Sequence, residues 1–169
     1  ANYRETKIRD ATVSLLKKAG VDFLLASTLP ALSEGLGLAK AMAESDFEYV
    51  ISFVIRQDGN LLDGNSLYNA LSTIDNSVSP KPAFFMLNCV HPTNCKQAIY
   101  IEPKNTDLVT TRLKGIQANG SPKSPEELEL IDRVDSESPK TWAEKMIDLH
   151  LNSEIQILGG CCGTNHQHI

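Results

Sequence analysis

The sequence predicts an α/β fold built on a parallel sheet, and three observations support this. Helical and strand-like segments alternate along the chain, with five strands in all, and strands separated by helices pair in parallel. The composition, with 41% hydrophobic and 22% charged residues, is that of an ordinary folded domain. A length of 169 residues suits one domain. Eight strand-helix units need about 250 residues, so any barrel in this chain is incomplete.

The first part of the chain predicts a helix, a strand and a second helix. Apolar residues recur at helical spacing at Ile8, Ala11, Leu15, Leu16 and Ala19. Gly20 ends this helix because it tolerates a positive φ. Residues 21–26 predict a short strand that is buried on both faces. After Pro30, a second helix presents an apolar face formed by Leu32, Leu36, Ala39 and Ala43.

Two further strands follow. Residues 49–55 are rich in β-branched and aromatic side chains, which favour a strand. Asp-Gly-Asn at 58–60 and again at 63–65 indicates turns. The next helix carries its apolar face at Leu67, Ala70, Leu71 and Ile74, and the third strand covers residues 83–87.

The second half is less regular. Residues 92–101 predict a short helix, and 113–118 predict a weaker fourth strand. Ser124 to Glu127 has the cap, the proline and the glutamate of a helix start. Thr141 to Glu144 is a second such box and opens a helix that runs to His150, before a last strand at 155–158. Residues 103–140 hold most of a polar insertion.

Charge and hydropathy exclude several classes of partner. The net charge is −5 and no stripe of Lys or Arg stands out, which argues against nucleic acid. No apolar run approaches the ~20 residues that span a bilayer, and residues 1–5 lack the apolar core of a signal peptide. Four cysteines are too few for a disulfide framework. We therefore expect a reducing cytoplasm, with the thiols used for chemistry or buried.

Three cysteines follow two of the predicted parallel strands. Cys89 comes after the third strand, and Cys161 and Cys162 come after the fifth, between glycines that permit a sharp turn. Ligands of such folds bind at the carboxyl ends of the strands. Three thiolates there can hold zinc and leave its fourth position open for a substrate sulfur. The alternative is that these thiols are small buried apolar side chains beside a tight turn.

The other potential ligands carry weaker signals. Cys95 is expected to be an unliganded thiol. His91 and His150 are expected to be solvated or core side chains. His166 and His168 lie close to the cysteine pair in sequence and are candidates to hydrogen-bond to the metal ligands and orient them.

The sequence resembles the zinc-dependent homocysteine S-methyltransferase family. The resemblance rests on Leu87-Asn88-Cys89, on Gly-Gly-Cys-Cys-Gly-Thr at 159–164, and on the closing His168-Ile169. Further agreement comes from residues 19–22, from Thr28, Pro30 and Glu34, from 51–53 and from Ala118-Asn119-Gly120, so that it extends over nearly the whole chain.

The resemblance implies a (β/α)8 TIM-barrel fold in which this chain supplies about five units, equivalent to strands four to eight. A single domain would then cover residues 1–169, with the N-terminal strands of the barrel missing. It also implies Zn²⁺ held by Cys89, Cys161 and Cys162, without a further catalytic side chain. Homocysteine, or a similar small thiol, would bind through its sulfur and attack a methyl donor to give methionine. The donor would be S-methylmethionine, S-adenosylmethionine, betaine or methylfolate.

The substrate residues implied by the resemblance are Ser27, Thr28 and Asn119. Ser27 stands where the family has a glutamate that holds the substrate ammonium, and a hydroxyl supplies no charge. The alternative for all three is a role as turn and capping residues. The missing N-terminal strands and Ser27 also leave open a second hypothesis, in which the chain is a truncated or diverged paralogue that binds zinc without turnover. An incomplete barrel exposes strand edges, so we expect either self-association or a missing N-terminal segment supplied elsewhere.

Overall fold

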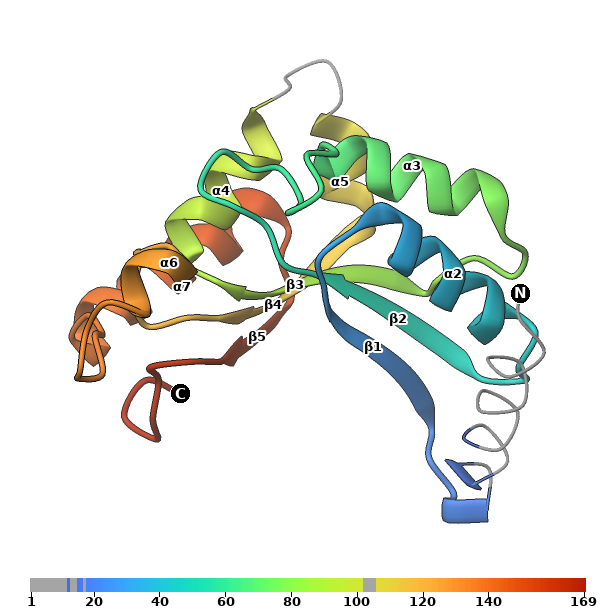
Figure 1. The fold of residues 1–169 in the computed structure, drawn as a ribbon, viewed down its shortest axis with the longest axis horizontal. Helices are drawn as coiled ribbons and strands as arrows, with labels where there is room; N and C mark the ends of the chain where they lie inside the picture. Colours follow the sequence, from blue (N-terminus) through green and yellow to red (C-terminus); the bar gives the residue numbers. More distant parts are fainter. Residues whose placement is uncertain (1–11, 13–14, 17, 102–105) are drawn as a thin grey trace.

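The computed structural model describes residues 12, 15–16, 18–101 and 106–169. Its centre is one sheet of five parallel strands in the order β1-β2-β3-β4-β5 (Figure 1). This confirms the predicted α/β class, the parallel pairing and the number of strands. The strands are β1 (Phe23–Leu29), β2 (Glu48–Phe53), β3 (Phe84–Val90), β4 (Leu113–Ala118) and β5 (Ile157–Gly160).

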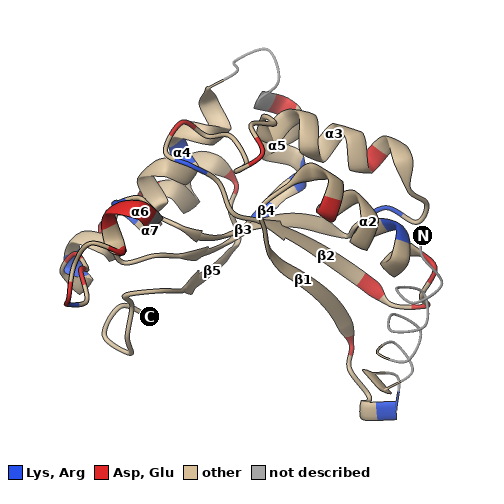
Figure 2. Cartoon of the chain, viewed as in Figure 1, with Lys and Arg blue, Asp and Glu red and all other residues tan. Residues whose placement is uncertain are grey.

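The helices lie on one side of this sheet (Figure 1). The first predicted helix falls largely outside the described residues, although Leu15, Leu16 and Ala19 are helical. The others are α2 (Leu32–Ala43), α3 (Leu67–Ser77), α4 (Pro92–Tyr100), α5 (Thr106–Arg112), α6 (Pro125–Leu128) and α7 (Pro139–Ser153). Basic and acidic residues are interspersed over these elements, without a continuous basic stripe among the residues drawn in colour (Figure 2).

The hydrophobic core fills the layer between the helices and the sheet. Ile51 and Phe53 of β2 and Leu87 of β3 point into it and are fully buried. Helix α2 approaches β2 closely because Gly35 has no side chain: a Cβ there would lie 2.6 Å from the Phe53 ring. The close approach of α2 to the sheet therefore depends on a glycine at position 35.

The prediction that the first strand is buried on both faces is wrong. In β1, Leu24 and Ala26 face the core, whereas Phe23 is 55% exposed and Leu25 is 38% exposed. Side chains alternate along a strand, so a sheet covered by helices on one side leaves every second residue on the other. The apolar run indicated two covered faces, but helices cover only one face of β1 in the described chain.

Other boundaries also differ from the sequence prediction. Strands β1 and β3 each end three residues later than predicted, so Cys89 lies within β3 and not after it. Helix α7 begins at Pro139, because Ser138 and not Thr141 is its cap: the Ser138 hydroxyl accepts from the Thr141 N–H. Strand β5 starts at Ile157, two residues later than predicted, and it contains Gly159 and Gly160, which the prediction placed after the strand. Helix α5 lies within the stretch that was assigned to a polar insertion.

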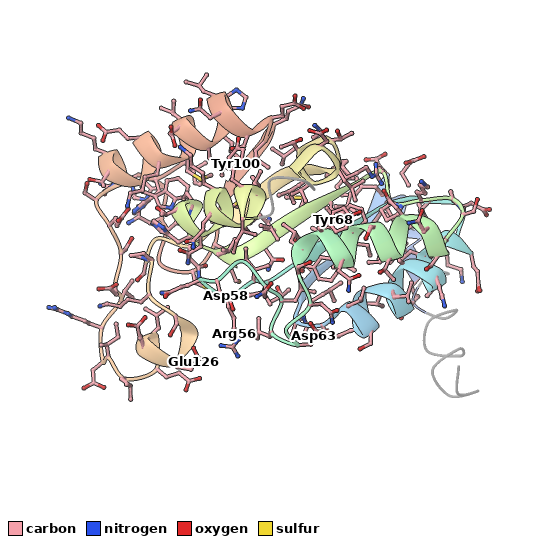
Figure 3. All side chains as sticks on the ribbon, turned by 90° about the horizontal axis from the view of Figure 1, so that it is seen from above. Arg56, Asp58, Asp63, Tyr68, Tyr100 and Glu126 are labelled. Carbon is pink, nitrogen blue, oxygen red and sulfur yellow. The ribbon has the colours of Figure 1, made fainter. Side chains whose placement is uncertain are left out.

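The loop between β2 and α3 supports its neighbours. Asp63 accepts a 2.8 Å hydrogen bond from the Leu32 N–H at the start of α2, where Ala31 offers no capping side chain. Arg56 forms a 3.0 Å ion pair with Glu126 of α6, so the loop also reaches the second half of the chain (Figure 3). The turns predicted at 58–60 and 63–65 are confirmed, with Gly59 and Gly64 at positive φ.

The packing at Gly35 can be tested with a matched pair in one helix. Gly35→Ala should lower the free energy of unfolding by about 1–3 kcal/mol, because the new methyl group overlaps the Phe53 ring. Gly37→Ala should raise it by about 0.5–1 kcal/mol, because no atom lies within 4 Å of the added Cβ. Urea unfolding measures both, and equal effects of the two substitutions would contradict this packing.

Candidate metal centre

Cys89 points away from the core because β3 is irregular at its carboxyl end. Strict alternation would place Cys89 on the same side as the core residue Leu87. The ladder to β4 instead pairs Asn88 with Gln117 and Val90 with Ala118, so Cys89 is one extra residue. Its φ is +53°, in the left-handed region. This bulge returns Val90 to the core and places the Cys89 thiol at the end of the sheet.

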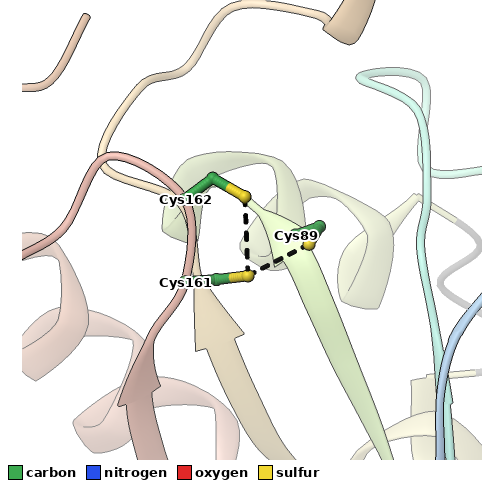
Figure 4. A group of neighbouring side chains, drawn as sticks. All are labelled: Cys89, Cys161 and Cys162. Carbon is green, nitrogen blue, oxygen red and sulfur yellow. Dashed lines mark hydrogen bonds between the residues drawn. The ribbon is translucent and has the colours of Figure 1, made fainter. Parts of the chain in front are cut away.

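Cys161 and Cys162 reach the same place from β5. Ala118, the last residue of β4, lies between Val90 of β3 and Gly160 of β5 in the ladder. Cys161 directly follows Gly160, so Cys89 and Cys161 leave the sheet at one level, on either side of the end of β4. Their sulfur atoms are 3.0 Å apart, and those of Cys161 and Cys162 are 3.9 Å apart (Figure 4).

Backbone hydrogen bonds hold the cysteine pair in this turn. The Cys161 N–H donates to the Ala118 carbonyl at 2.8 Å, and the Gly120 N–H donates to the Cys162 carbonyl at 2.9 Å. Gly163 has a φ of +78°, which a glycine adopts without strain. The prediction that glycines permit a sharp turn between two neighbouring thiols is thus confirmed.

The three thiols affect one another's ionisation. Burial, followed by the hydrogen bond and charge of Cys161, raises the pKa of Cys89 to about 12. Burial also opposes ionisation of Cys161, but hydrogen bonds from Cys89 and from Cys162 outweigh it, so the pKa of Cys161 lies below its ordinary value. Burial and the neighbouring Cys161 raise the pKa of Cys162. The cluster therefore favours one thiolate, shared between two thiol donors.

The donor set fits a thiophilic metal ion. The three sulfur atoms all lie within 4.8 Å of one another. Two sulfurs bound to a tetrahedral zinc ion lie about 3.8 Å apart, since each Zn–S bond is about 2.3 Å. The Cys161–Cys162 separation already matches this value, and the closer Cys89–Cys161 pair needs a small outward rotation. Their role as metal ligands stays a prediction.

Cys95 and the histidines lie outside this cluster in the structure. Cys95 is fully buried in the core on α4, and burial raises its pKa to about 12. His91 is buried and caps α4, and burial lowers its pKa. His168 bonds to Asn165, Ser136 and the Glu137 carbonyl, with its ring edge-on to Trp142.

The three predicted substrate residues lie in two places. Ser27 is exposed near the end of β1, and Thr28 beside it hydrogen-bonds to Asn88, the residue before Cys89. Asn119 follows β4, between the two cysteine-bearing strands, and the Trp142 indole N–H donates to its carbonyl at 2.9 Å. Its Oδ1 atom is buried and has no hydrogen-bond partner among the described residues.

Two cavities flank the thiols, and Asn119 lines both. One, of about 290 Å³, is bordered by Cys89, Asn94 and Lys123. The other, of about 410 Å³, is bordered by Cys162, Leu128 and Val134. Neither Ser27 nor Thr28 lines these two cavities.

The sequence prediction assigned no role to the side chain of Asn88. An asparagine inside an apolar strand is unusual, and this could have indicated that its side chain has a specific role.

Comparison with known proteins places the chain. By its fold and its site, the chain is an α/β protein with a thiol-rich site at the carboxyl ends of its parallel strands. The family model described as homocysteine S-methyltransferase matches residues 3–169. The chain therefore belongs to the homocysteine S-methyltransferase family, which confirms the resemblance and makes it a methyltransferase-type protein. A search of curated proteins finds no match. In the described residues, no helix is long and apolar enough to cross a membrane.

Zinc binding can be tested directly on the cysteines. Purified protein should carry about one zinc ion, and Cys161→Ser should lose it, because two thiolates bind the ion much more weakly than three. Cys95→Ala is the matched control and should keep its zinc, since Cys95 lies outside the cluster. Elemental analysis after gel filtration measures the content. One equivalent of zinc retained without Cys89, Cys161 or Cys162 would refute the site.

Proton release provides a second test. A thiol must lose its proton to bind a metal, and the pKa values of Cys89 and Cys162 are raised in the folded chain. Zinc binding at pH 7 should therefore release about two protons or more, and the apparent affinity should fall as the pH falls. Calorimetry in buffers of different ionisation enthalpy measures the protons. A pH-independent affinity would show that other groups bind the ion.

Proposed function

We propose that this protein transfers a methyl group to the thiol of homocysteine, giving methionine, with zinc held by Cys89, Cys161 and Cys162. One observation carries the proposal: Cys89 and the adjacent pair Cys161 and Cys162, which begins 72 residues further along the chain, meet at the carboxyl edge of a parallel sheet. That edge is where α/β proteins bind their ligands, and the chain belongs to a family named for this reaction.

The proposed reaction needs residues that hold the zinc ion and residues that align the methyl donor. Bound zinc would keep one coordination position open and lower the pKa of a substrate thiol. The bulge at Cys89 and the turn at Cys161 and Cys162 hold the three ligands in place. No side chain has to act as a general base for the attacking sulfur. The remaining requirement is to align the methyl donor with that sulfur.

The amino-acid part of the thiol substrate is assigned to the cavity beside Cys89. Asn119 lines this cavity, and its buried side-chain oxygen Oδ1, which has no hydrogen-bond partner in the described part of the chain, suits the substrate ammonium. Ser27 and Thr28 do not line this cavity, and their hydroxyls would meet the substrate from the end of β1. A neutral amide and hydroxyls would then replace the carboxylate that the family has at position 27.

The methyl donor is assigned to the second cavity, beside Cys162. Leu128 and Val134 supply apolar contacts there, and the carboxylates of Asp132 and Asp135 outnumber the single cation of Arg133. This lining suits a small sulfonium or ammonium donor, such as S-methylmethionine or betaine, better than a large anionic folate. We further propose that the five strands correspond to strands four to eight of a (β/α)8 barrel, in one domain that acts in the cytoplasm.

Methyl transfer is tested with zinc-loaded protein, homocysteine and each donor in turn, with methionine measured by mass spectrometry. S-methylmethionine should give turnover, and Cys162→Ser should abolish it while Cys95→Ala retains it. Zinc bound at one equivalent without methionine from any donor would favour a non-catalytic zinc-binding paralogue. Preference for another small thiol in a competition assay would change the assigned acceptor.

A further inference from the structure

Strands β1 and β3 share one irregularity at their carboxyl ends. In β3 the extra residue is Cys89, at a φ of +53°. In β1, Ala26 pairs with Ile51 and Leu29 pairs with Phe53, so β1 also holds one residue more than β2. Thr28, in this interval, has a φ of +61°, which a β-branched residue rarely adopts. In both strands the second-to-last residue is thus left-handed.

The side chain of Asn88 connects these two ends. Its Oδ1 atom accepts from the Thr28 N–H at 2.8 Å and from the Ser52 hydroxyl at 2.6 Å. Its Nδ2 atom donates to the Thr28 hydroxyl oxygen at 2.6 Å. A backbone N–H can only donate, so the orientation of the amide is determined. Asn88 is 2% exposed, and these three bonds fix it against both β1 and β2.

Two consequences follow for the site. The peptide that leads into Cys89 starts at a residue whose side chain is fixed, so the direction of the Cys89 thiol is tied to β1. The Thr28 hydroxyl accepts from Asn88 and therefore keeps its own proton for another acceptor. No partner for that proton occurs among the described residues, and Thr28 is exposed.

We propose that Asn88 is a positioning residue that holds the metal ligand Cys89 and the Thr28 hydroxyl in one fixed relation. The inference rests on the proposed function and deepens it. Asn88 touches neither metal nor substrate. Through Cys89 it orients the metal-binding thiol, and through Thr28 it presents a hydroxyl donor to the carboxylate of an amino-acid thiol.

The test uses the protein loaded with Co²⁺, whose absorption reports bound thiolates, and titrates it with homocysteine. Asn88→Ala should keep about one equivalent of cobalt, because all three cysteines remain. Its dissociation constant for homocysteine should rise about tenfold, because Thr28 and Cys89 lose their common support. Asn69→Ala is the matched control: this asparagine is exposed on α3, bonds to Asn65, and should leave the constant unchanged.

A second substitution separates positioning from general stability. Glycine adopts a positive φ without strain, so Thr28→Gly removes the need for the backbone support from Asn88. Asn88→Ala should shift the cobalt absorption, because no side chain then ties Cys89 to β1. The double variant Asn88→Ala with Thr28→Gly should regain unfolding free energy that Asn88→Ala loses, but its cobalt absorption should stay shifted. A role in stability alone predicts that the spectrum returns together with the stability.

The outcomes distinguish this inference from the proposed function. Wild-type protein that holds cobalt but binds no thiol would overturn both. Wild-type protein that binds homocysteine, together with an Asn88→Ala variant of equal affinity and spectrum, would overturn the inference alone. If Asn88→Ala does not fold, Thr28→Val keeps the side-chain shape and removes only the hydroxyl. It should weaken homocysteine binding, and unchanged binding would overturn the inference.

Discussion

The candidate site depends on the two-residue period of side chains along β3, and on one interruption of it. A regular strand would send Cys89 into the helix layer with Leu87. The bulge adds one residue and turns the thiol toward Cys161. A left-handed backbone at a residue other than glycine costs about 1–2 kcal/mol. Hydrogen bonds of about 0.5–1.5 kcal/mol each, such as those of the neighbouring Asn88, offset a cost of this size.

The rest of the fold supports this edge of the sheet. Parallel pairing brings the carboxyl ends of all five strands to one side. The end of β4 leaves room for two sulfur atoms to meet beyond Ala118, and the loop after β4 is held by Trp142 of α7. The ionisation of the thiols also depends on how the fold buries them and brings them together. Burial keeps Cys89 protonated in the isolated cluster, while its hydrogen bond favours a thiolate at Cys161.

Sequence patterns predicted the features that depend on local chemistry. The β-branched run gave β2 nearly to its ends, 113–118 matches β4 residue for residue, and the flanking glycines correctly placed the cysteine turn. Features that depend on tertiary contacts were missed. The exposure of Phe23 follows from which face of the sheet the helices cover, and no periodicity within one strand encodes that. The role of Asn88 requires β1 and β2 alongside β3. The cap of α7 was misplaced because Ser138 and Thr141 offer equivalent hydroxyls three residues apart.

The sequence separation within the thiol cluster has a thermodynamic consequence. Cys89 and Cys161 are 72 residues apart along the chain and in contact only in the folded protein. An ion bound by both closes a long loop, whose entropy the unfolded chain would otherwise retain. Binding to the native state alone raises the unfolding free energy with the logarithm of free ion concentration. A metal ion held by the proposed ligands would therefore couple metal supply to conformational stability, and it would join β3 to β5 across the end of β4.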